Sequence, residues 1–179
     1  MTLRISGGEL RGRRLVAPPG RGTRPTRAAV REAWFNALGP EVAGARVLDL
    51  FAGTGALGIE ALSRGAASAE FVEADARTHR ILRRNLETLG LADRARSRRV
   101  DVFRRLAEVT DRAFDIALAD PPYETGAARR LVRVWLERPF AGILCVEHGP
   151  NELDGFESGW RRTYGETELS FFIASEETS

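Results

Sequence analysis

Segments typical of buried β-strands alternate with segments typical of α-helices over most of this chain, and the alternation limits the folds open to it. The stretches between the strand-like runs carry apolar residues at helical spacing, as in ALGIEALSRG and DARTHRILRRNLETLG. The strand-like runs are ARVLDLF, SAEFVEA, ARSRRVDV, FDIALAD and GILCVEH. Five such alternations predict an α/β fold, a doubly wound Rossmann-like parallel sheet with helices on both faces. At 179 residues, the chain has room for one such domain.

Both ends of the chain depart from this alternation. In the tail, SGWRRTYGETELSFFIA, two strand-like runs meet at Gly165-Glu166 without a helix between them, which predicts an antiparallel hairpin at the sheet edge. The first segment has two short alternating pieces around Gly7-Gly8 and then a run rich in proline and glycine, which predicts a basic β-hairpin and a loop. We therefore expect an N-terminal hairpin and loop at 1–25 and a main domain at 26–179.

A helix is predicted to open the main domain. Apolar residues recur at helical spacing from Val30 to Leu38, and Gly39-Pro40 ends the pattern. Thr26 lies just before this run, where its hydroxyl suits an N-cap. The predicted helix therefore follows Thr26.

Cysteine and histidine are too scarce for several classes of protein. One cysteine, Cys145, excludes an internal disulfide framework, and with only two histidines the chain lacks the ligands of a His/Cys zinc cluster. We expect no metal site. The sequence also has no signal-peptide core and no apolar run near the roughly 18 residues of a membrane span, which predicts a cytoplasmic protein without a membrane partner.

The net charge of +2 conceals a strong asymmetry along the chain. Residues 1–36 carry a net +6 and residues 77–105 a net +7, whereas residues 146–179 carry a net −6. Every basic residue is arginine, which suits bidentate contacts to phosphate, although a codon-biased genome explains the missing lysines better. The clustering of arginine is harder to attribute to composition, and it predicts a polyanionic partner such as nucleic acid.

A glycine loop, GTGALG at 53–58, follows the first strand-like run and matches the dinucleotide fingerprint G-x-G-x-x-G. Asp49 precedes Gly53 by four positions, where its charge would repel the pyrophosphate of a nicotinamide dinucleotide. S-adenosylmethionine carries an ammonium group and a sulfonium but no phosphate, so the loop with this acid favours that cofactor. The alternative is that Asp49 only completes the turn.

Three further acids lie near the ends of the second and third strand-like runs. Glu73, twenty positions after Gly53, is placed to accept hydrogen bonds from ribose hydroxyls, which suits both cofactors; alternatively it is an exposed carboxylate. Asp75 is expected to cap the next helix. Asp101, at the predicted end of the third strand, could bind an adenine amino group or could equally be an N-cap.

A second motif, Asp120-Pro121-Pro122-Tyr123, follows the strand FDIALA. Prolines stiffen the chain and remove N–H donors, so the Asp120 carboxylate and the Pro121 carbonyl can accept both hydrogens of an exocyclic NH₂ group. Tyr123 offers a ring on which the base can stack. Together these groups orient an aromatic amine toward an electrophilic methyl, and Asp120 stabilises the positive charge that develops on nitrogen. The alternative is a proline-rich loop with a capping aspartate.

In these segments the chain resembles the RsmD-like 16S rRNA guanine-N2 methyltransferases, a family with the class I S-adenosylmethionine-dependent fold. The likeness covers nearly the whole chain. It rests on RISGGELRGRRL, RPTRAAVREAWFNAL, VLDLFAGTGALGIEALSRGA, FVEAD and the DPPY sequence, of which the first two are the most specific.

The resemblance implies a seven-stranded class I methyltransferase sheet whose last pair is the C-terminal hairpin. It also implies S-adenosylmethionine as cofactor and guanine 966 of 16S rRNA, within or before assembly of the small ribosomal subunit, as the type of target. The cofactor site would include Thr26 at its rim, Asp49, Phe51, Gly53, Gly55, Glu73 and Asp101, and the target base would meet Asp120, Pro121, Pro122 and Tyr123. The RNA would bind Arg4, Arg11, Arg13, Arg14 and Arg24. The arginine-rich stretch RARSRRV departs from the family pattern beside Asp101.

Three other functions compete with this interpretation. An adenine-N6 DNA or RNA methyltransferase also uses DPPY, but such enzymes usually need an added target-recognition region for which this chain has little length. A nicotinamide-dependent oxidoreductase conflicts with Asp49 and with DPPY, and a non-catalytic RNA-binding module conflicts with the presence of both motifs. We expect a monomer.

Overall fold

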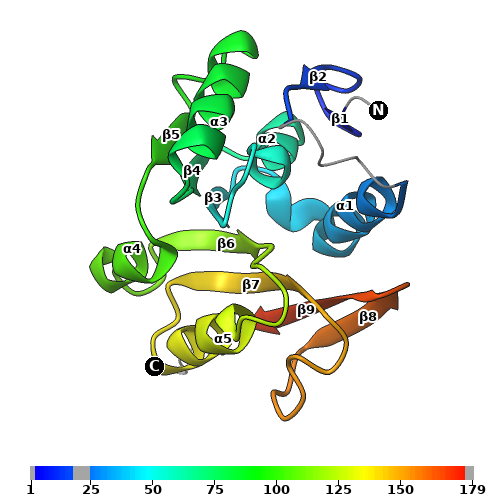
Figure 1. The fold of residues 1–179 in the computed structure, drawn as a ribbon, viewed down its shortest axis with the longest axis vertical. Helices are drawn as coiled ribbons and strands as arrows, with labels where there is room; N and C mark the ends of the chain where they lie inside the picture. The colour runs from blue at the N-terminus through cyan, green and yellow to red at the C-terminus, as the bar shows by residue number, and fades with distance from the viewer. Residues whose placement is uncertain (1–2, 18–24, 176–179) are drawn as a thin grey trace.

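Parallel pairing of the apolar strands builds one seven-stranded sheet in the computed structural model, which describes residues 3–17 and 25–175 (Figure 1). Its order is β5-β4-β3-β6-β7-β9-β8. The strands are β3 (Arg46–Leu50), β4 (Ser68–Val72), β5 (Ala95–Arg98), β6 (Phe114–Ala119), β7 (Ala141–His148), β8 (Trp160–Tyr164) and β9 (Thr167–Ile173). The first five strands are parallel to one another, whereas β9 is antiparallel to both β7 and β8. The doubly wound sheet and its C-terminal hairpin are confirmed.

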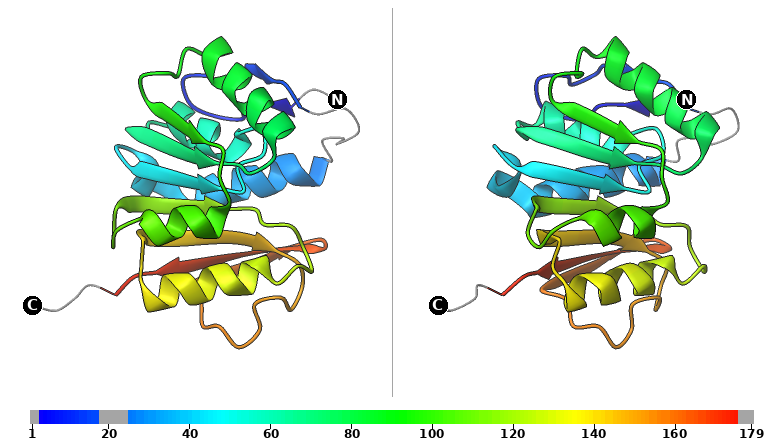
Figure 2. Two further views of the ribbon diagram at one scale, coloured as in Figure 1. Left: turned by 60° about the vertical axis from the view of Figure 1, so that its left-hand side comes forward. Right: turned by 90° about the vertical axis from the view of Figure 1, so that its left-hand side faces the viewer.

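Helices cover both faces of the sheet (Figures 1 and 2). One hydrophobic cluster joins α1 (Pro25–Leu38), α2 (Ala56–Ser63) and α3 (Ala76–Thr88) to one face, and a second cluster joins α4 (Val102–Glu108) and α5 (Ala127–Glu137) to the other. Strands that are covered on both faces have nearly continuous apolar sequences, and this made most of them recognisable.

Because β3, β4 and β6 are parallel, their carboxyl ends meet at one edge of the sheet, where a ligand site of this fold is expected.

The N-terminal hairpin is present as two short antiparallel strands, β1 (Leu3–Arg4) and β2 (Arg14–Leu15). It lies beside α2 and α3 rather than apart from the domain (Figure 1), and Ile5 and Leu15 are buried in the same cluster as α1 and α2. Gly8, with φ +77°, presses against the end of α2, where an added Cβ would lie 1.8 Å from the Ser63 carbonyl oxygen. The hairpin is thus part of the packed structure.

Two local expectations are wrong. Helix α1 begins at Pro25, so Thr26 lies in the first turn and is not the N-cap, because proline is favoured at the first helical position. Helix α1 ends at Leu38, where the Gly-Pro pair predicted an end, and a 3₁₀ turn (Gly39–Val42) follows it. The third strand ends at Arg98, so Asp101 does not end a strand but stands at the N-terminus of α4.

Within the described ranges, no helix is both long and apolar enough to cross a membrane. Across the same residues, no group of three or more histidine, cysteine, aspartate or glutamate side chains is arranged to hold a metal ion.

Candidate functional site

The glycine loop turns sharply from β3 into α2. Phe51 and Gly53 have φ values of +56° and +58°, and Gly55, with φ +85°, stands at the N-cap of α2. At Gly55 an added Cβ would lie 2.5 Å from Leu82 Cδ1, so both the backbone angle and the packing require glycine. At Gly53 the nearest atom to an added Cβ is 4.0 Å away, so this part of the loop faces open space. Phe51 packs edge-on against Phe103.

Asp49 is buried in β3 behind this loop, with 1 % of its surface exposed. Its Oδ2 accepts a hydrogen bond of 2.9 Å from the Gly58 amide, in the first turn of α2. Burial raises the pKa of Asp49 well above its usual range, the Gly58 amide opposes that change, and the charges of Asp120 and Glu73 raise the pKa further. A cation bound beside Asp49 would favour its ionised form.

Glu73 ties the glycine loop to the end of β4. One of its carboxylate oxygens accepts the Gly53 amide at 2.9 Å, and the other accepts the Asp75 amide at 2.8 Å. Each oxygen keeps a lone pair for a further donor. Asp75 caps α3 through the Thr78 amide, as expected, and Asp101 caps α4 through the Arg104 amide at 3.0 Å. For Asp101 the capping alternative is therefore present in the structure.

The second motif follows β6 at the neighbouring strand end. Asp120 is exposed and Pro121 is buried. The Tyr123 hydroxyl donates to Glu147 Oε1 at 3.0 Å and lies 2.9 Å from the Thr167 hydroxyl, so β7 and β9 both hold the ring. Burial is the main cause that raises the pKa of Tyr123, and Glu147 and Asp120 add to it. The phenol therefore stays neutral and serves to fix the ring.

Asp49, Glu73 and Asp120 thus form one carboxylate cluster at the ends of β3, β4 and β6. Their charges interact, since both Asp120 and Glu73 affect the pKa of Asp49. The cluster lies where the parallel strands end, next to the open side of Gly53. Such an arrangement can hold a cationic ligand and an amine donor side by side.

The predicted RNA-binding arginines lie on the hairpin and are exposed. Arg4 and Arg14 are directly opposite each other on β1 and β2, an arrangement of like charges that disfavours the free hairpin and favours a bound anion. Arg13 reaches the Thr88 carbonyl at the end of α3, so the first basic segment meets the second. Arg24 lies outside the described residues, and Thr26 is described only by its backbone in α1.

Comparison with known proteins identifies the family. The family model described as conserved hypothetical protein 95 matches residues 3–173. Ribosomal RNA small subunit methyltransferase D of Escherichia coli K12 is 42% identical over 132 residues, which cover 74% of this chain and 66% of that protein. The chain belongs to the RsmD-like methyltransferase family. A second relative, the Bacillus subtilis protein YlbH, is 36% identical over 95% of this chain and 98% of its own length.

Solved structures agree with this assignment to the RsmD-like methyltransferases. The Escherichia coli protein yhhF superposes with a TM-score of 0.82 at 33% identity, over 97% of this chain and 98% of that one. The 16S rRNA N2 G1207 methyltransferase (RsmC) of T. thermophilus, solved with AdoMet and guanosine, superposes with a TM-score of 0.72 at 28% identity, over 98% of this chain and 50% of that one. The class I methyltransferase fold is confirmed.

In this RsmD-like methyltransferase, two buried side chains that the sequence analysis missed join the hairpin to the site. Glu60, in α2, is fully buried and accepts three hydrogen bonds from Ser6 and Gly7 at 2.7–2.8 Å. It also pairs with Arg64 at 2.9 Å and Arg31 at 3.4 Å. This one carboxylate therefore anchors the hairpin to α2 and α1.

Asn85, in α3, connects the hairpin with the glycine loop. Its Oδ1 accepts the Val16 amide at 2.8 Å, and its Nδ2 donates to the Val16 carbonyl at 3.1 Å and the Thr54 carbonyl at 3.0 Å. The side chain is buried, so these bonds are shielded from water. The sequence could have indicated this role, because asparagine has low helix propensity and yet lies inside an otherwise good helical pattern.

Proposed function

We propose that the chain transfers a methyl group from S-adenosylmethionine to the exocyclic N2 amine of a guanine in 16S rRNA, of the guanine 966 type. The observation that carries this proposal is the adjacency of two strand ends. The loop from Asp120 to Tyr123 follows β6, and Asp120 lies close enough to Asp49, at the end of β3, to raise its pKa. A loop suited to an aromatic amine thus adjoins a carboxylate suited to a cation.

The residues of the glycine loop fit a cofactor with a positive charge and a ribose. Bound S-adenosylmethionine supplies an electrophilic methyl group. The buried Asp49 carboxylate, already hydrogen-bonded to the Gly58 amide, offers a charge for the ammonium end of the cofactor. Glu73 has free lone pairs for the ribose hydroxyls, and Gly53 leaves room beside them. We assign Thr26, Phe51, Gly55 and Asp101 to the same site because the family resemblance implies it.

Catalysis by this chain is a matter of position and charge. The Asp120 carboxylate and the Pro121 carbonyl accept the two hydrogens of the amine, which directs the nitrogen lone pair out of the ring plane. The base stacks on Tyr123, whose ring is fixed by Glu147 and Thr167. As the N–C bond would form and the methyl–sulfur bond break, Asp120 stabilises the positive nitrogen, which then releases one proton to water. No strong general base is needed.

The N-terminal segment at 1–25, whose hairpin packs against the methyltransferase domain at 26–179, is proposed to hold the rRNA. Its exposed arginines stand beside the basic α3, so the two basic segments form one surface suited to phosphates. The names of the relatives support rRNA as the substrate class, and that of the T. thermophilus enzyme supports the N2 amine of guanine. Such a substrate implies work in the cytoplasm, on the small subunit or an intermediate of its assembly.

Radiolabelled methyl transfer tests this proposal. Small subunits from cells that lack the enzyme, naked 16S rRNA and duplex DNA serve as substrates, and mass spectrometry of the nucleosides identifies the product. We expect N2-methylguanine in the rRNA. Asp120→Ala should lower the rate about a hundredfold or more, since loss of one preorganised electrostatic group commonly costs that much, with cofactor affinity largely kept.

Glu137→Gln, an exposed change on α5, is the matched control and should leave the rate unchanged. N6-methyladenine in place of N2-methylguanine would support the adenine alternative and contradict the proposal.

A further inference from the structure

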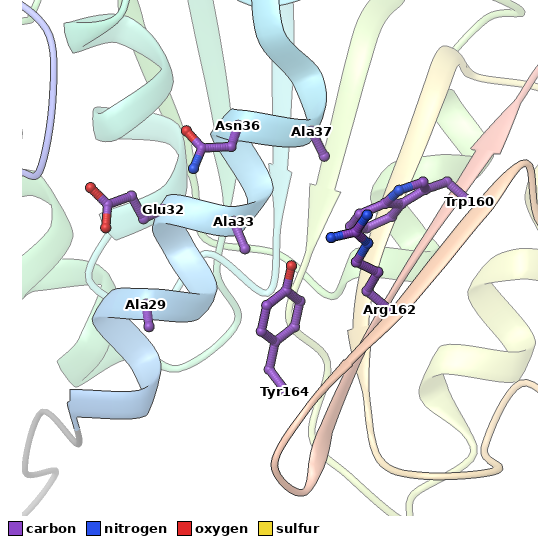
Figure 3. Close-up of a pocket in the computed structure, with 8 residues that line it drawn as sticks. All are labelled: Ala29, Glu32, Ala33, Asn36, Ala37, Trp160, Arg162 and Tyr164. Carbon is purple, nitrogen blue, oxygen red and sulfur yellow. The ribbon is translucent and has the colours of Figure 1, made fainter.

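An open groove runs between α1 and the edge strand β8, outside the residues assigned so far (Figure 3). Its volume is about 440 Å³, within the range of sites that bind small molecules or single nucleotides. The wall on β8 consists of Trp160, Arg162 and Tyr164, and α1 supplies the opposite wall. The groove is therefore lined by aromatic rings and an arginine on one side.

The β-strand period explains the wall on β8. Trp160, Arg162 and Tyr164 alternate with residues of the other face, and they share their face with their cross-strand partners on β9, of which Leu169 and Phe171 are buried against the α1 side. The Arg162 guanidinium lies 5.5 Å from the centre of the Trp160 ring. It makes no hydrogen bond or ion pair with any described residue, so its charge is available to a ligand.

The wall on α1 consists largely of alanines, whose short side chains project little into the groove. Ala29 and Ala33 lie one turn apart and face the groove across from Tyr164 (Figure 3). Glu32 and Asn36 stand at the rim, are exposed, and have no hydrogen bond with the described residues. Small side chains opposite aromatic rings suit a planar group, and the polar rim residues suit its edges.

The groove is connected to the proposed target-base site through β9. Tyr164 pairs across β8 and β9 with Thr167, and the Thr167 hydroxyl contacts the Tyr123 hydroxyl. One residue thus separates a ring assigned to the target base from a ring of the groove. A strand that delivers a base to Tyr123 would find the next stacking surface at Tyr164.

We propose that this groove binds an unpaired nucleotide that flanks the target base in single-stranded RNA. The base stacks on Tyr164, Trp160 lies further along the same wall, and Arg162 between them contacts the phosphate. Alternating aromatic and basic side chains are the means by which proteins hold single-stranded nucleic acid. The inference rests on the proposed function, which makes RNA the substrate. It adds that the groove contacts the nucleotide next to the modified base. Glu32 disfavours phosphate on the α1 side, so the phosphate lies toward β8.

Tryptophan fluorescence reports directly on this groove. The chain has three tryptophans, and Trp34 and Trp135 are buried at 0% and 4% exposed, so quenching by a bound base reports on Trp160. The probe is an unstructured single-stranded RNA of about ten nucleotides, in the range of single-strand binding sites. We expect saturable quenching in the wild type and none in Trp160→Phe. Tyr164→Ala should lower the affinity about fivefold to a hundredfold, as loss of one stacked base implies.

Arg162→Glu should also weaken binding, whereas Arg133→Glu, the same charge change at an exposed site on α5 across the sheet, should leave the affinity within about twofold. Melting temperatures confirm that each variant folds. Absence of quenching with unchanged RNA affinity in both groove variants would overturn the proposal. The proposal would also be overturned if the groove variants changed the oligomeric state of the protein but not its affinity for RNA. The groove would then be a contact between protein chains. The RNA readout does not depend on methyl transfer, so failure of the proposed reaction is scored separately.

Discussion

Asp49 is a carboxylate held away from water, with one backbone hydrogen bond and two other carboxylates nearby. Burial and these charges make its ionised form costly in the folded protein, and the raised pKa expresses that cost. The ionised Asp49 carboxylate can thus bind a cationic ligand, but it destabilises the folded protein when no such ligand is bound. Function and stability oppose each other at this residue.

Asp49→Asn should stabilise the protein without cofactor. The folded-state pKa lies above the unfolded value of about 4, so the stabilising contribution of the protonated acid is lost as pH rises through the folded pKa. The asparagine keeps the hydrogen-bond acceptor without this loss. Near neutral pH we expect the variant to melt about 2–4 °C higher, the change that 1 kcal/mol produces at this chain length.

Melting curves of both proteins over a range of pH check this prediction. The difference in Tm should grow as pH rises, and it should shrink or reverse with saturating S-adenosylmethionine, which stabilises only the protein that binds it. A difference that does not change with pH would contradict the explanation.

At the residue scale, the sequence predicted the acids but not their partners. Asp49, Glu73 and Asp120 could be recognised because each follows or ends an apolar strand. Glu147 and Thr167 could not, because they contact Tyr123 from 24 and 44 positions away along the chain. Such contacts depend on strand order, which local patterns leave open.

At the scale of elements, the hairpin and the glycine loop are mechanically joined. Glu60 anchors the hairpin at Ser6 and Gly7, and Asn85 bonds both Val16 and Thr54. A buried amide that serves two segments fixes their relative position only while both are in place. Order in one segment therefore favours order in the other.

Asn85→Ala should break this link. We expect a loss of about 1–3 kcal/mol of unfolding free energy, because the backbone groups of Val16 and Thr54 lose the buried Asn85 amide as their partner. In the wild type, S-adenosylmethionine should slow amide hydrogen exchange in both the glycine loop and residues 3–16. In the variant, saturating cofactor should protect the loop alone. Arg84→Ala, at the adjacent exposed position, serves as control, and protection of the hairpin that persists in Asn85→Ala would refute the link.

The elements themselves were largely predictable, and the errors have local causes. Five parallel strands and the Gly165-Glu166 turn follow from patterns that span few residues. The helix start at Pro25 was misplaced because both Thr26 and Pro25 fit an N-terminus, and proline took the first helical position. The groove of Trp160, Arg162 and Tyr164 escaped prediction, because α1 and β8 are distant in sequence.

At the scale of the whole molecule, the basic segments gather and the acidic ones lie elsewhere. The hairpin meets the end of α3 through Arg13 and Thr88, which brings the basic hairpin and the basic helix α3 to one side. Such a surface attracts RNA at long range and makes binding sensitive to salt.

Replacement of Arg11, Arg13 and Arg14 by alanine should weaken RNA binding and flatten its salt dependence. The slope of log affinity against log salt should become less steep by about 2, if each arginine neutralises one phosphate of a single strand. Titrations at several salt concentrations measure the slope. Arg133→Ala should change it little, since that side chain lies on the face covered by α5. An unchanged slope in the triple variant would remove the hairpin from the RNA-binding surface.

The position of β9 in the sheet has a consequence for synthesis. β9 leaves the ribosome after the other strands, yet it lies between β7 and β8. β8 cannot join the sheet until β9 arrives, and Thr167 of β9 holds the Tyr123 hydroxyl. A growing chain can therefore assemble its glycine loop while the tyrosine loop still lacks this anchor, because domains begin to fold from their N-terminal parts during translation. The half of the site proposed to select the base is the last to be completed.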